Sequence, residues 1–588
     1  MLRFIVRLFA FIGFTVVAAV IATAVLLLRE REPTLPGTVV LDLDLEGPLA
    51  ESPSDRLGGL LGREATLRDV LDALERGRRD PQVKGLYARF GGDGIGFAQA
   101  QELRAAVERF RASGRFAIAF AEAYGEGRSG NRAYLLASAF DEVWLQPLGL
   151  LSLTGLSAQI PFVRDALDKL DIQPQIMQRE EYKSLADTFS RSGFTPANRE
   201  MMESLLDDLT GQIVDGVARG RRLAPTAVRE AMDRAPLLDR EALEARLIDR
   251  IGYADEAQDA ARQRAGAGAE TVKTLDYLDA AGPAHADGPT VALIHAVGTI
   301  TSGESGKPGL GEVAAGAETI VEAIEAAMAD PGVVAILFRI DSGGGSVSAS
   351  EAIWRALTRA RQAGKPVIAS MGDTAASGGY WIALGADRIV AEPGTLTGSI
   401  GVVAGKMAAN GLSERLGVNW GVIDTGRNAG MWSPLRPFTA SEEERLAAII
   451  DSSYTAFLSR VAEARRLTPE QARSVAKGRV WTGAQARDLG LVDELGGQET
   501  ALVLARQAAG LAPDAAVTLT LFPRPKSAAE RIRDLVSGKG ELVETAAALA
   551  ALRPVLTAVR PLLRVVEEGA AGGSVEVQAR MPALGLDR

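Results

Sequence analysis

The chain has 588 residues, of which 47% are hydrophobic and 24% charged, a composition typical of globular rather than disordered protein. One hydrophobic core does not organise a chain of this length, so we expect at least two domains. The net charge of −10 argues against nucleic acid as a main partner. The chain lacks cysteine and has only two histidines, His285 and His295, so we expect neither a thiolate nucleophile nor a metal or other cofactor.

The first predicted element is a membrane-spanning helix. Residues 8–28 carry no charge, and they are enough to cross a hydrocarbon core of roughly 30 Å as a helix. Arg3 and Arg7 precede this segment, so the positive-inside rule places residues 1–7 in the cytoplasm and the rest of the chain outside. We expect an uncleaved signal anchor, and a cleaved signal peptide is the alternative interpretation.

The rest of the chain contains an internal repeat. Residues 84–120 resemble residues 334–370 at an offset of 250, and residues 194–209 resemble residues 438–453 at an offset of 244. We therefore expect an anchor, a first repeat, a linker, a second repeat and an Ala/Leu-rich helical tail, at residues 1–36, 37–270, 271–287, 288–520 and 521–588.

Strands and helices alternate within each repeat. In the second repeat the pattern predicts strands and helices in the order strand 290–298, helix 316–330, strand 333–340, helix 348–364, strand 365–371, helix 377–386 and strand 387–392. Such alternation predicts an α/β fold with a mostly parallel sheet. Ligands of such folds gather beyond the carboxyl ends of the strands. Two Gly-rich turns are expected at those ends, "DSGGGS" at 341–346 and "GDTAASGG" at 372–379.

Ser377 lies between a predicted strand and a predicted helix. The amide groups at a helix start have no partner within the helix, so a hydroxyl placed there can attack a carbonyl while neighbouring amides hold the oxyanion. Gly378 and Gly379 allow a substrate to approach closely, and the glycines of "DSGGGS" offer further exposed amides. Taken alone, a serine that only caps the helix is the simpler interpretation.

Four motifs together change this interpretation. "EYKS", "DSGGGSVSASE", "GDTAASGGYWIA" and "GTLTGSIG" occur in this order, and the chain resembles the long form of the signal peptide peptidase A (SppA, protease IV) family over roughly residues 37–520. The N-terminal anchor belongs to the resemblance as well. Gly343 stands where the family pattern D-S-P-G-G-S has proline, and the tail beyond residue 525 is not matched.

The resemblance implies a membrane-anchored serine endopeptidase with a Ser/Lys dyad, which degrades released signal peptides and other extended apolar peptides. It implies two tandem ClpP/crotonase-like repeats and a homotetramer. It also implies that the N-terminal helix lies in the lipid of a bacterial inner membrane, with the catalytic body on the periplasmic side. The motifs assign Ser377 as nucleophile, Lys183 as general base, Ser399 as the residue that orients the lysine, and Gly344 and Gly378 as oxyanion amides.

The repeat tests this assignment from the sequence itself. Ser377 aligns with Asn131 of the first repeat, and Lys183 aligns with Arg427 of the second. Asparagine is no hydroxyl nucleophile, and arginine does not lose its proton usefully. The two copies therefore retain complementary halves of a dyad, which favours a dyad divided between them over chance divergence.

A general-base lysine must be neutral, which requires a pKa lowered by burial. Glu180 and Glu181 are therefore expected to point away from Lys183. Lys406, which follows the "IGVVAG" stretch, is the best alternative base, whereas His295 is expected inside a strand. Two other functions remain open: a crotonase-like acyl-CoA hydratase or thioesterase, and a catalytically dead membrane scaffold.

Overall fold

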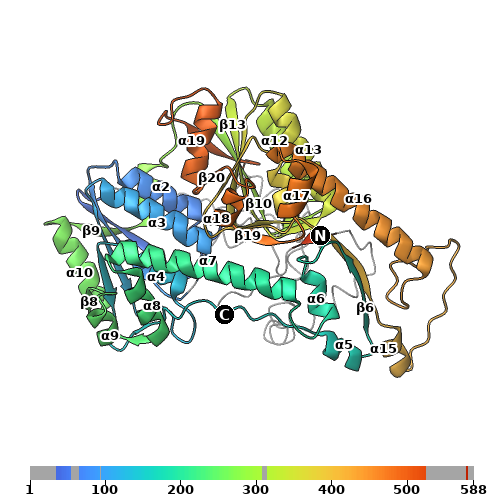
Figure 1. Ribbon diagram of the computed structural model, residues 1–588. Helices are drawn as coiled ribbons and strands as arrows, with labels where there is room; N and C mark the ends of the chain where they lie inside the picture. Colours follow the sequence, from blue (N-terminus) through green and yellow to red (C-terminus); the bar gives the residue numbers. More distant parts are fainter. Residues whose placement is uncertain (1–34, 54–64, 93, 307–313, 525–577, 581–588) are drawn as a thin grey trace, which may run out of the picture.

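The computed structural model describes residues 35–53, 65–92, 94–306, 314–524 and 578–580 (Figure 1). The predicted anchor and nearly all of the predicted helical tail lie outside these residues. Within the described ranges, no helix combines the length and the apolar character needed to cross a membrane.

The first repeat contains a parallel sheet with the strand order β8-β4-β3-β2-β1-β9. Its strands are β1 (Val39–Leu45), β2 (Val83–Phe90), β3 (Phe116–Ala121), β4 (Glu142–Leu145), β8 (Arg250–Ile251) and β9 (Glu270–Lys273). Its helices are α2 (Leu67–Gly77), α3 (Phe97–Ala112), α4 (Asn131–Ala137), α5 (Arg164–Lys169), α6 (Leu185–Ser190), α7 (Pro196–Arg221), α8 (Pro225–Arg234), α9 (Asp239–Glu244), α10 (Ala254–Ala265) and α11 (Thr274–Ala281). A short antiparallel pair joins β5 (Leu150–Leu151) to β7 (Leu237–Leu238).

The second repeat contains the same arrangement, with the parallel order β20-β16-β15-β13-β10-β21. Its strands are β10 (Thr290–Val297), β13 (Val333–Ser342), β15 (Val367–Ala376), β16 (Arg388–Ala391), β17 (Leu396–Gly398), β19 (Val480–Thr482), β20 (Glu494–Leu495) and β21 (Thr518–Phe522). Its helices are α12 (Ala317–Ala329), α13 (Val347–Gln362), α14 (Gly378–Ala383), α15 (Asn410–Arg415), α16 (Ala440–Arg465), α17 (Pro469–Val475), α18 (Gly483–Asp488) and α19 (Gln498–Ala508). The predicted α/β fold with mostly parallel sheets and two repeats is therefore confirmed.

Helices cover both faces of the second sheet, and the sequence explains why. Helix α13 buries Ala349, Ile353, Ala356, Leu357 and Ala360, which lie on one face at helical spacing. Alternate residues of β13 face opposite sides of the sheet, so its side chains enter two different cores. One of these cores includes α12 and α13, and the other includes α19. The strand is consequently apolar almost throughout, as strands buried on both faces are.

A third sheet joins the two repeats, in the order β12-β11-β14-β22-β18-β6. Strand β6 (Gln173–Gln178) of the first repeat pairs antiparallel with β18 (Val403–Ala408) of the second. In Figure 1, β6, α5 and α6 lie beside α15, at the opposite end of the molecule from α10. This crossing brings residues that follow β6 in the first repeat onto the second repeat. The other strands are β11 (Thr299–Thr301), β12 (Ala314–Gly316), β14 (Gly344–Ser346) and β22 (Gln578–Arg580).

A buried ion cluster also connects the repeats. Arg339 of β13 is fully buried and pairs with Glu51 at 2.9 Å and with Glu102 at 3.0 Å, both from the first repeat. Its repeat counterpart, Arg89, is partly exposed and pairs with Asp44 at 3.0 Å. The equivalent arginines have therefore diverged, and the one in the second repeat holds the interface. Breaking such a buried pair typically destabilises a protein by about 3–5 kcal/mol.

The region before Ser377 differs from the expected turn. Residues 372–376 continue strand β15, because its end pairs in parallel with β17, from Thr374 opposite Leu396 to Ala376 opposite Gly398. The expected turn at 341–346 is likewise largely strand, formed by the end of β13 and by β14. Both Gly-rich segments are therefore fixed by sheet hydrogen bonds.

Candidate active site

Ser377 occupies a sharp turn between β15 and α14, with φ of 56° and ψ of −116°. This positive φ is rare for a residue other than glycine, and such strain concentrates at functional sites. The backbone is held on both sides: its N–H donates to the Gly398 carbonyl at 2.8 Å, and its carbonyl accepts from the Trp381 N–H at 2.9 Å. The side chain of Ser377 is fully buried.

The two glycines after Ser377 are required by close packing against β13 and β14. A Cβ at position 378 would lie 2.7 Å from Oγ of Ser350 and 3.1 Å from Cα of Gly344. A Cβ at position 379 would lie 2.4 Å from the Ser342 carbonyl oxygen. Gly344 and Gly378, the two predicted oxyanion residues, are thus neighbours at the start of α14. The Gly344 amide donates to the Ser342 hydroxyl at 3.1 Å.

Lys183 lies directly beside the serine. Its Nζ is 2.7 Å from Oγ of Ser377, 3.0 Å from Oγ of Ser399 and 3.0 Å from the Ser399 carbonyl oxygen. Its side chain is fully buried, and this burial lowers the pKa of Lys183 well below its ordinary value. A neutral amine has two hydrogens and one lone pair. The two Ser399 oxygens accept the hydrogens, which leaves the lone pair for the Ser377 hydroxyl.

Two glycines of the second repeat form part of the wall around Lys183. A Cβ at position 478 would lie 2.6 Å from the Lys183 backbone nitrogen, and one at position 401 would lie 3.1 Å from its Cδ. The expectation that Glu180 and Glu181 point away from the amine is confirmed. Glu180 pairs with Arg473 at 2.8 Å and Glu181 with Lys477 at 3.0 Å, both with exposed partners. Desolvation therefore dominates the electrostatics of the amine.

Ser399 follows β17 directly and has a positive φ of 49°. Its N–H donates to the Arg479 carbonyl at 2.7 Å, so the residue is fixed between β17 and the chain before β19. The side chain is buried. The structure thus brings together all five residues that the motifs singled out, from both repeats.

The alternative bases lie elsewhere. Lys406 donates to the Met431 carbonyl at 2.8 Å, and its amine lies 4.3 Å above the Phe438 ring. His295 pairs in register with Arg339 inside the sheet, and burial lowers its pKa to about 4. His285 lies between Arg506 and Glu499.

The positions equivalent to the dyad have other roles. Asn131 is buried, and its side-chain amide donates to the Gly155 carbonyl at 2.6 Å while its carbonyl accepts from the Gly155 N–H at 3.2 Å. Asn131 therefore fixes the loop at Gly155 through hydrogen bonds, whereas Ser377, at the equivalent position of the second repeat, presents a hydroxyl. Arg427 is exposed.

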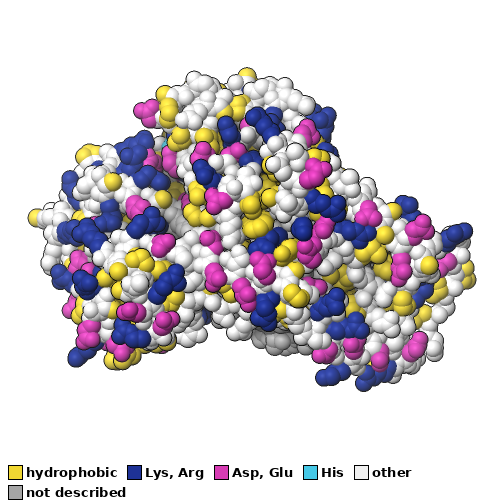
Figure 2. All heavy atoms as spheres, viewed as in Figure 1, with side chains coloured by type: hydrophobic (Ala, Val, Ile, Leu, Met, Phe, Trp, Pro, Cys, Tyr) yellow, Lys and Arg dark blue, Asp and Glu magenta, His cyan; other side chains and the backbone are white. Residues whose placement is uncertain are grey.

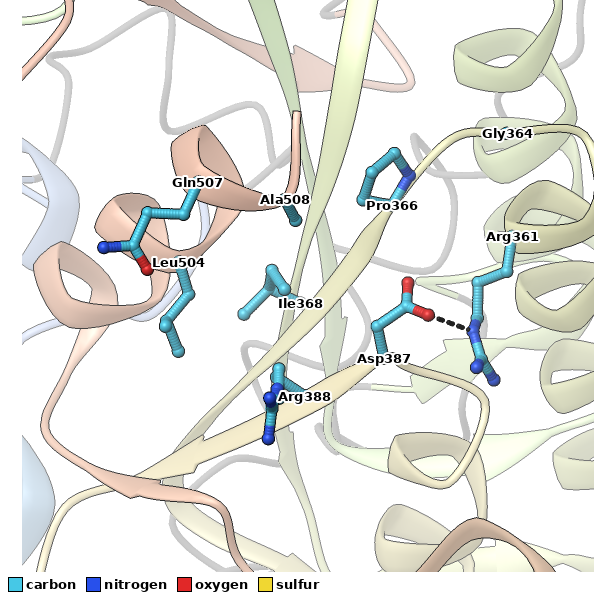
Figure 3. Close-up of a pocket in the computed structure, with 9 residues that line it drawn as sticks. All are labelled: Arg361, Gly364, Pro366, Ile368, Asp387, Arg388, Leu504, Gln507 and Ala508. Carbon is cyan, nitrogen blue, oxygen red and sulfur yellow. Dashed lines mark hydrogen bonds and ion pairs between the residues drawn. The ribbon is translucent and has the colours of Figure 1, made fainter. Parts of the chain in front are cut away.

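On the side of the molecule shown in Figure 2, cationic and anionic side chains are interspersed and form no large patch of one charge that would suggest a binding site. The hollow drawn in Figure 3 contains Arg361 and Asp387, which already pair with each other at 2.7 Å. The remaining residues that line it are Gly364, Pro366, Ile368, Arg388, Leu504, Gln507 and Ala508. The hollow therefore lacks a nucleophile with an adjacent base, and the buried serine and lysine remain the candidate centre.

Comparison with known proteins agrees with this geometry. Peptidase family S49 matches residues 117–268 and again residues 359–512. The chloroplastic serine protease SPPA of Arabidopsis thaliana is 31% identical over 86% of this chain and 74% of its own length. Protease 4 of Salmonella typhi is 32% identical over 82% of this chain and 79% of its own. A putative signal peptide peptidase SppA of Enterococcus faecium is 34% identical over 29% of this chain and 50% of its own. The chain therefore belongs to peptidase family S49, alongside the Protease 4 and SppA enzymes, and is a serine protease.

Proposed function

We propose that this serine protease is a membrane-anchored endopeptidase that uses a Ser377–Lys183 dyad to degrade released signal peptides and other extended apolar peptides. The observation that supports the dyad most directly is the 2.7 Å distance between Nζ of Lys183 and Oγ of Ser377 in a fully buried pocket. The name of the Enterococcus faecium relative supports the substrate class.

In the proposed reaction, Oγ of Ser377 attacks the carbonyl carbon of the scissile peptide bond while its proton passes to the lone pair of Lys183. Amides of Gly344 and Gly378 hold the oxyanion, which replaces the Ser342 hydroxyl as the acceptor of the Gly344 N–H. The Lys183 ammonium then protonates the leaving amine, and an acyl-enzyme forms. Lys183 next removes a proton from water, which attacks the ester carbonyl. As the bond to Oγ of Ser377 breaks, the Lys183 ammonium returns that proton to Oγ, so the acyl product leaves as an acid and the free serine and neutral lysine are restored.

Peptide cleavage by single and double variants tests the dyad. Ser377→Ala and Lys183→Ala should each lower turnover by roughly 10⁴-fold or more, and the double variant should lose little beyond either one, because the pair acts as a unit. Lys183→Arg should be nearly as inactive, since arginine stays charged. Lys406→Ala is the matched control and should keep most activity. Near-normal turnover of Lys183→Ala, with loss of activity in Lys406→Ala, would contradict the assignment.

Labelling with a serine-reactive fluorophosphonate separates an active enzyme from a dead scaffold. The wild-type chain should be labelled at Ser377, and Ser377→Ala should not. The alternative function, a crotonase-like acyl-CoA hydratase or thioesterase, is no longer supported, because the chain belongs to a peptidase family. The dead scaffold predicts no labelling in any variant, whereas the strained serine beside a buried amine favours labelling.

We further propose that residues 8–28 anchor the chain in a bacterial inner membrane and that residues 29–588 lie on the periplasmic side. The charge asymmetry around the apolar segment supports this topology. Protease added to spheroplasts should digest the body and leave a short cytoplasmic stub. Complete protection of the body would contradict the proposal.

We also propose, from the family resemblance, that the chain forms a homotetramer, and the repeat supports self-association of the chain. Helix α15 stands in the second repeat where α5 stands in the first, so the residues after α15 correspond to β6. In the first repeat β6 is paired with β18, whereas the corresponding segment exposes five apolar side chains: Leu416, Val418, Trp420, Val422 and Ile423. A second copy that covered this segment would bury it in the same manner.

Sedimentation of the detergent-solubilised chain tests the assembly. A variant with Trp420→Asp and Ile423→Asp should sediment as a smaller species than the wild-type chain. Tyr253→Asp, which changes an exposed aromatic residue of the first repeat, is the control and should leave the assembly unchanged. Equal sedimentation of all three chains would remove this segment from the interface.

A further inference from the structure

Helix α3 of the first repeat begins without a capping side chain of its own. The residue before the helix is Gly96, which has an extended backbone and no side chain that could accept the first helix amides. Its counterpart at the offset of 250 is Ser346, whose hydroxyl accepts from the Ala349 N–H at 3.2 Å at the start of α13. The equivalent helices of the two repeats are therefore capped in different ways.

Asp373 of the second repeat supplies the missing cap. Its Oδ1 accepts from the N–H groups of Ala98 at 2.7 Å and Gln99 at 3.2 Å, the second and third residues of α3. These are the amides that the side chain before a helix normally satisfies. A Cβ at position 96 would lie 1.6 Å from Oδ2 of Asp373, so the glycine makes room for the carboxylate. Burial raises the pKa of Asp373 to about 6, and above this pH its charge complements the positive end of the helix.

Asp373 lies in β15 four residues before Ser377, and the chain between them is held by sheet hydrogen bonds. Residues 374–376 pair with β17. The Thr374 N–H also donates to Oδ1 of Asp341 in β13 at 2.9 Å. A short strand that is held from both sides leaves little freedom to absorb a shift, so a displacement of Asp373 reaches Ser377.

Helix α3 also contacts the segment that leads to Ser399. Oε1 of Gln101 accepts from the Gly394 N–H at 2.7 Å, and a Cβ at position 394 would lie 2.1 Å from the ring of Phe97. Gly394 is five residues before Ser399, whose two oxygens accept from the Lys183 amine. The first turns of α3 therefore contact both second-repeat segments that end in the serines around Lys183.

We propose that Asp373 is a positioning residue, which caps helix α3 of the first repeat and thereby fixes the strand that carries Ser377 relative to Lys183. The proposal rests on the proposed Ser377–Lys183 mechanism. Proton transfer requires Oγ of Ser377 and Nζ of Lys183 to lie within hydrogen-bond distance, and these atoms belong to different repeats. The Asp373 carboxylate joins the two repeats on the strand of the nucleophile itself.

Moving the cap from Asp373 to position 96 separates helix capping from positioning. Asp373→Ala should lower the midpoint of urea unfolding. Adding Gly96→Ser to Asp373→Ala should restore about half of this loss or more, because the serine then caps its own helix as Ser346 does. Gly96→Ser alone should lower the midpoint, since its Cβ would collide with Asp373. The change of sign between the two backgrounds checks that both residues use one capping position.

Turnover of an extended peptide at pH 8 should depend on the link between the repeats. Asp373→Ala should lower kcat by about 10-fold or more, and the double variant Gly96→Ser with Asp373→Ala should stay as slow although its helix is capped, because a small misplacement of reacting groups is costly. Fluorophosphonate labelling of Ser377 should slow in parallel. Asp373→Asn keeps an acceptor oxygen and should retain kcat within about three-fold.

Ser204→Ala is the matched control, because it also removes a hydrogen bond between the repeats, from Nε2 of Gln485 at 3.2 Å, and should keep kcat. Recovery of both the urea midpoint and kcat in the double variant would overturn the inference and leave Asp373 as a helix cap only. An equal effect of Gly96→Ser in both backgrounds would also overturn it. In either case a labelled, active wild-type chain would leave the proposed mechanism standing. A wild-type chain that was neither labelled nor active would refute that mechanism, and the positioning role with it.

Discussion

Replacing Lys183 by methionine should abolish activity and at the same time change how stability depends on pH. The buried amine has a pKa well below its ordinary value of about 10.5, because desolvation disfavours the charged form. The folded chain therefore releases a proton that the unfolded chain retains. Methionine has a similar length and no charge, so the variant removes this penalty while it keeps most of the packing.

The sign follows from the protons bound in each state. At any pH between the lowered folded-state pKa and about 10.5, the unfolded state binds one more proton at Lys183 than the folded state. The free energy of unfolding of the wild-type chain therefore rises with pH through this group, by about 1.4 kcal/mol per pH unit. Lys183→Met lacks this slope. Its stability relative to wild type should be greatest at the low end of the window and should decline by that amount per unit as the pH rises.

A second effect opposes the gain. The methionine sulfur is a weak acceptor and no donor, so the hydrogen bonds from the amine to Ser399 and the contact with Ser377 are lost. Each costs about 1 kcal/mol. This loss does not depend on pH across the window, so it shifts the whole curve and leaves its slope intact. The slope is therefore the quantity to measure.

Urea unfolding followed by tryptophan fluorescence provides the measurement. Trp381 is buried in α14, four residues after Ser377, and reports on the second repeat. Wild type, Lys183→Met and Ser377→Ala should be compared at pH 7, 8 and 9. Ser377→Ala is the matched control because it loses activity but keeps the buried amine and hence the slope. A stability difference between Lys183→Met and wild type that stayed constant with pH would refute the conclusion that Lys183 is neutral in the folded chain.

Three further predictions concern other residues. Burial raises the pKa of Glu392 to about 8 from an ordinary 4.5, so between these pH values the folded chain retains a proton that the unfolded chain loses. The free energy of unfolding should therefore fall as the pH rises through this range. Glu392→Gln should reduce this fall, measured as melting temperatures between pH 5 and 8. Gly378→Ala should lower peptide turnover by about 100-fold, because its Cβ would displace the start of α14 from β14, whereas Gly343→Ala meets nothing within 4 Å and should keep activity. Gly343→Pro should raise the free energy of unfolding in urea by about 0.4–1 kcal/mol, because a Cβ at position 343 meets no atom within 4 Å and the φ of Gly343 is not positive. A lower free energy of unfolding would show that the fold needs the Gly343 amide.

Much of the fold follows from local pattern. The strand predicted at 333–340 is observed as β13 over Val333–Ser342, and the helix predicted at 348–364 as α13 over Val347–Gln362. These elements have strong periodicity, and the repeat shows each of them twice. The nearness of Lys183 to Ser377 has no local signal, since 194 residues separate them. It was accessible only through family resemblance and the complementary losses in the two repeats.

Other features depend on contacts between distant segments. Strand β15 continues to Ala376 because β17 pairs with it, and no alternation in "GDTAA" predicts this. Gly478 gives no hint in the sequence that its missing side chain makes room for Lys183. Strand β22 covers three residues of a segment that reads as helical tail, and its conformation depends on the two strands beside it. Contacts between distant segments therefore decide all three features, and in β15 and β22 they override local propensity.

In the proposed mechanism, the division of the dyad between the repeats makes catalysis depend on how the two repeats dock. Neither repeat contains both groups, so the amine reaches the serine only when β6 pairs with β18. The same interface buries Arg339 against carboxylates of the first repeat, and Asp373 accepts a hydrogen bond at 2.7 Å from the Ala98 amide at the start of α3. Charged groups buried across an interface tolerate little misalignment, because an unpaired charge there is strongly unfavourable. They therefore fix the position of one repeat on the other, and a nucleophile and base that must meet within hydrogen-bond distance require that precision.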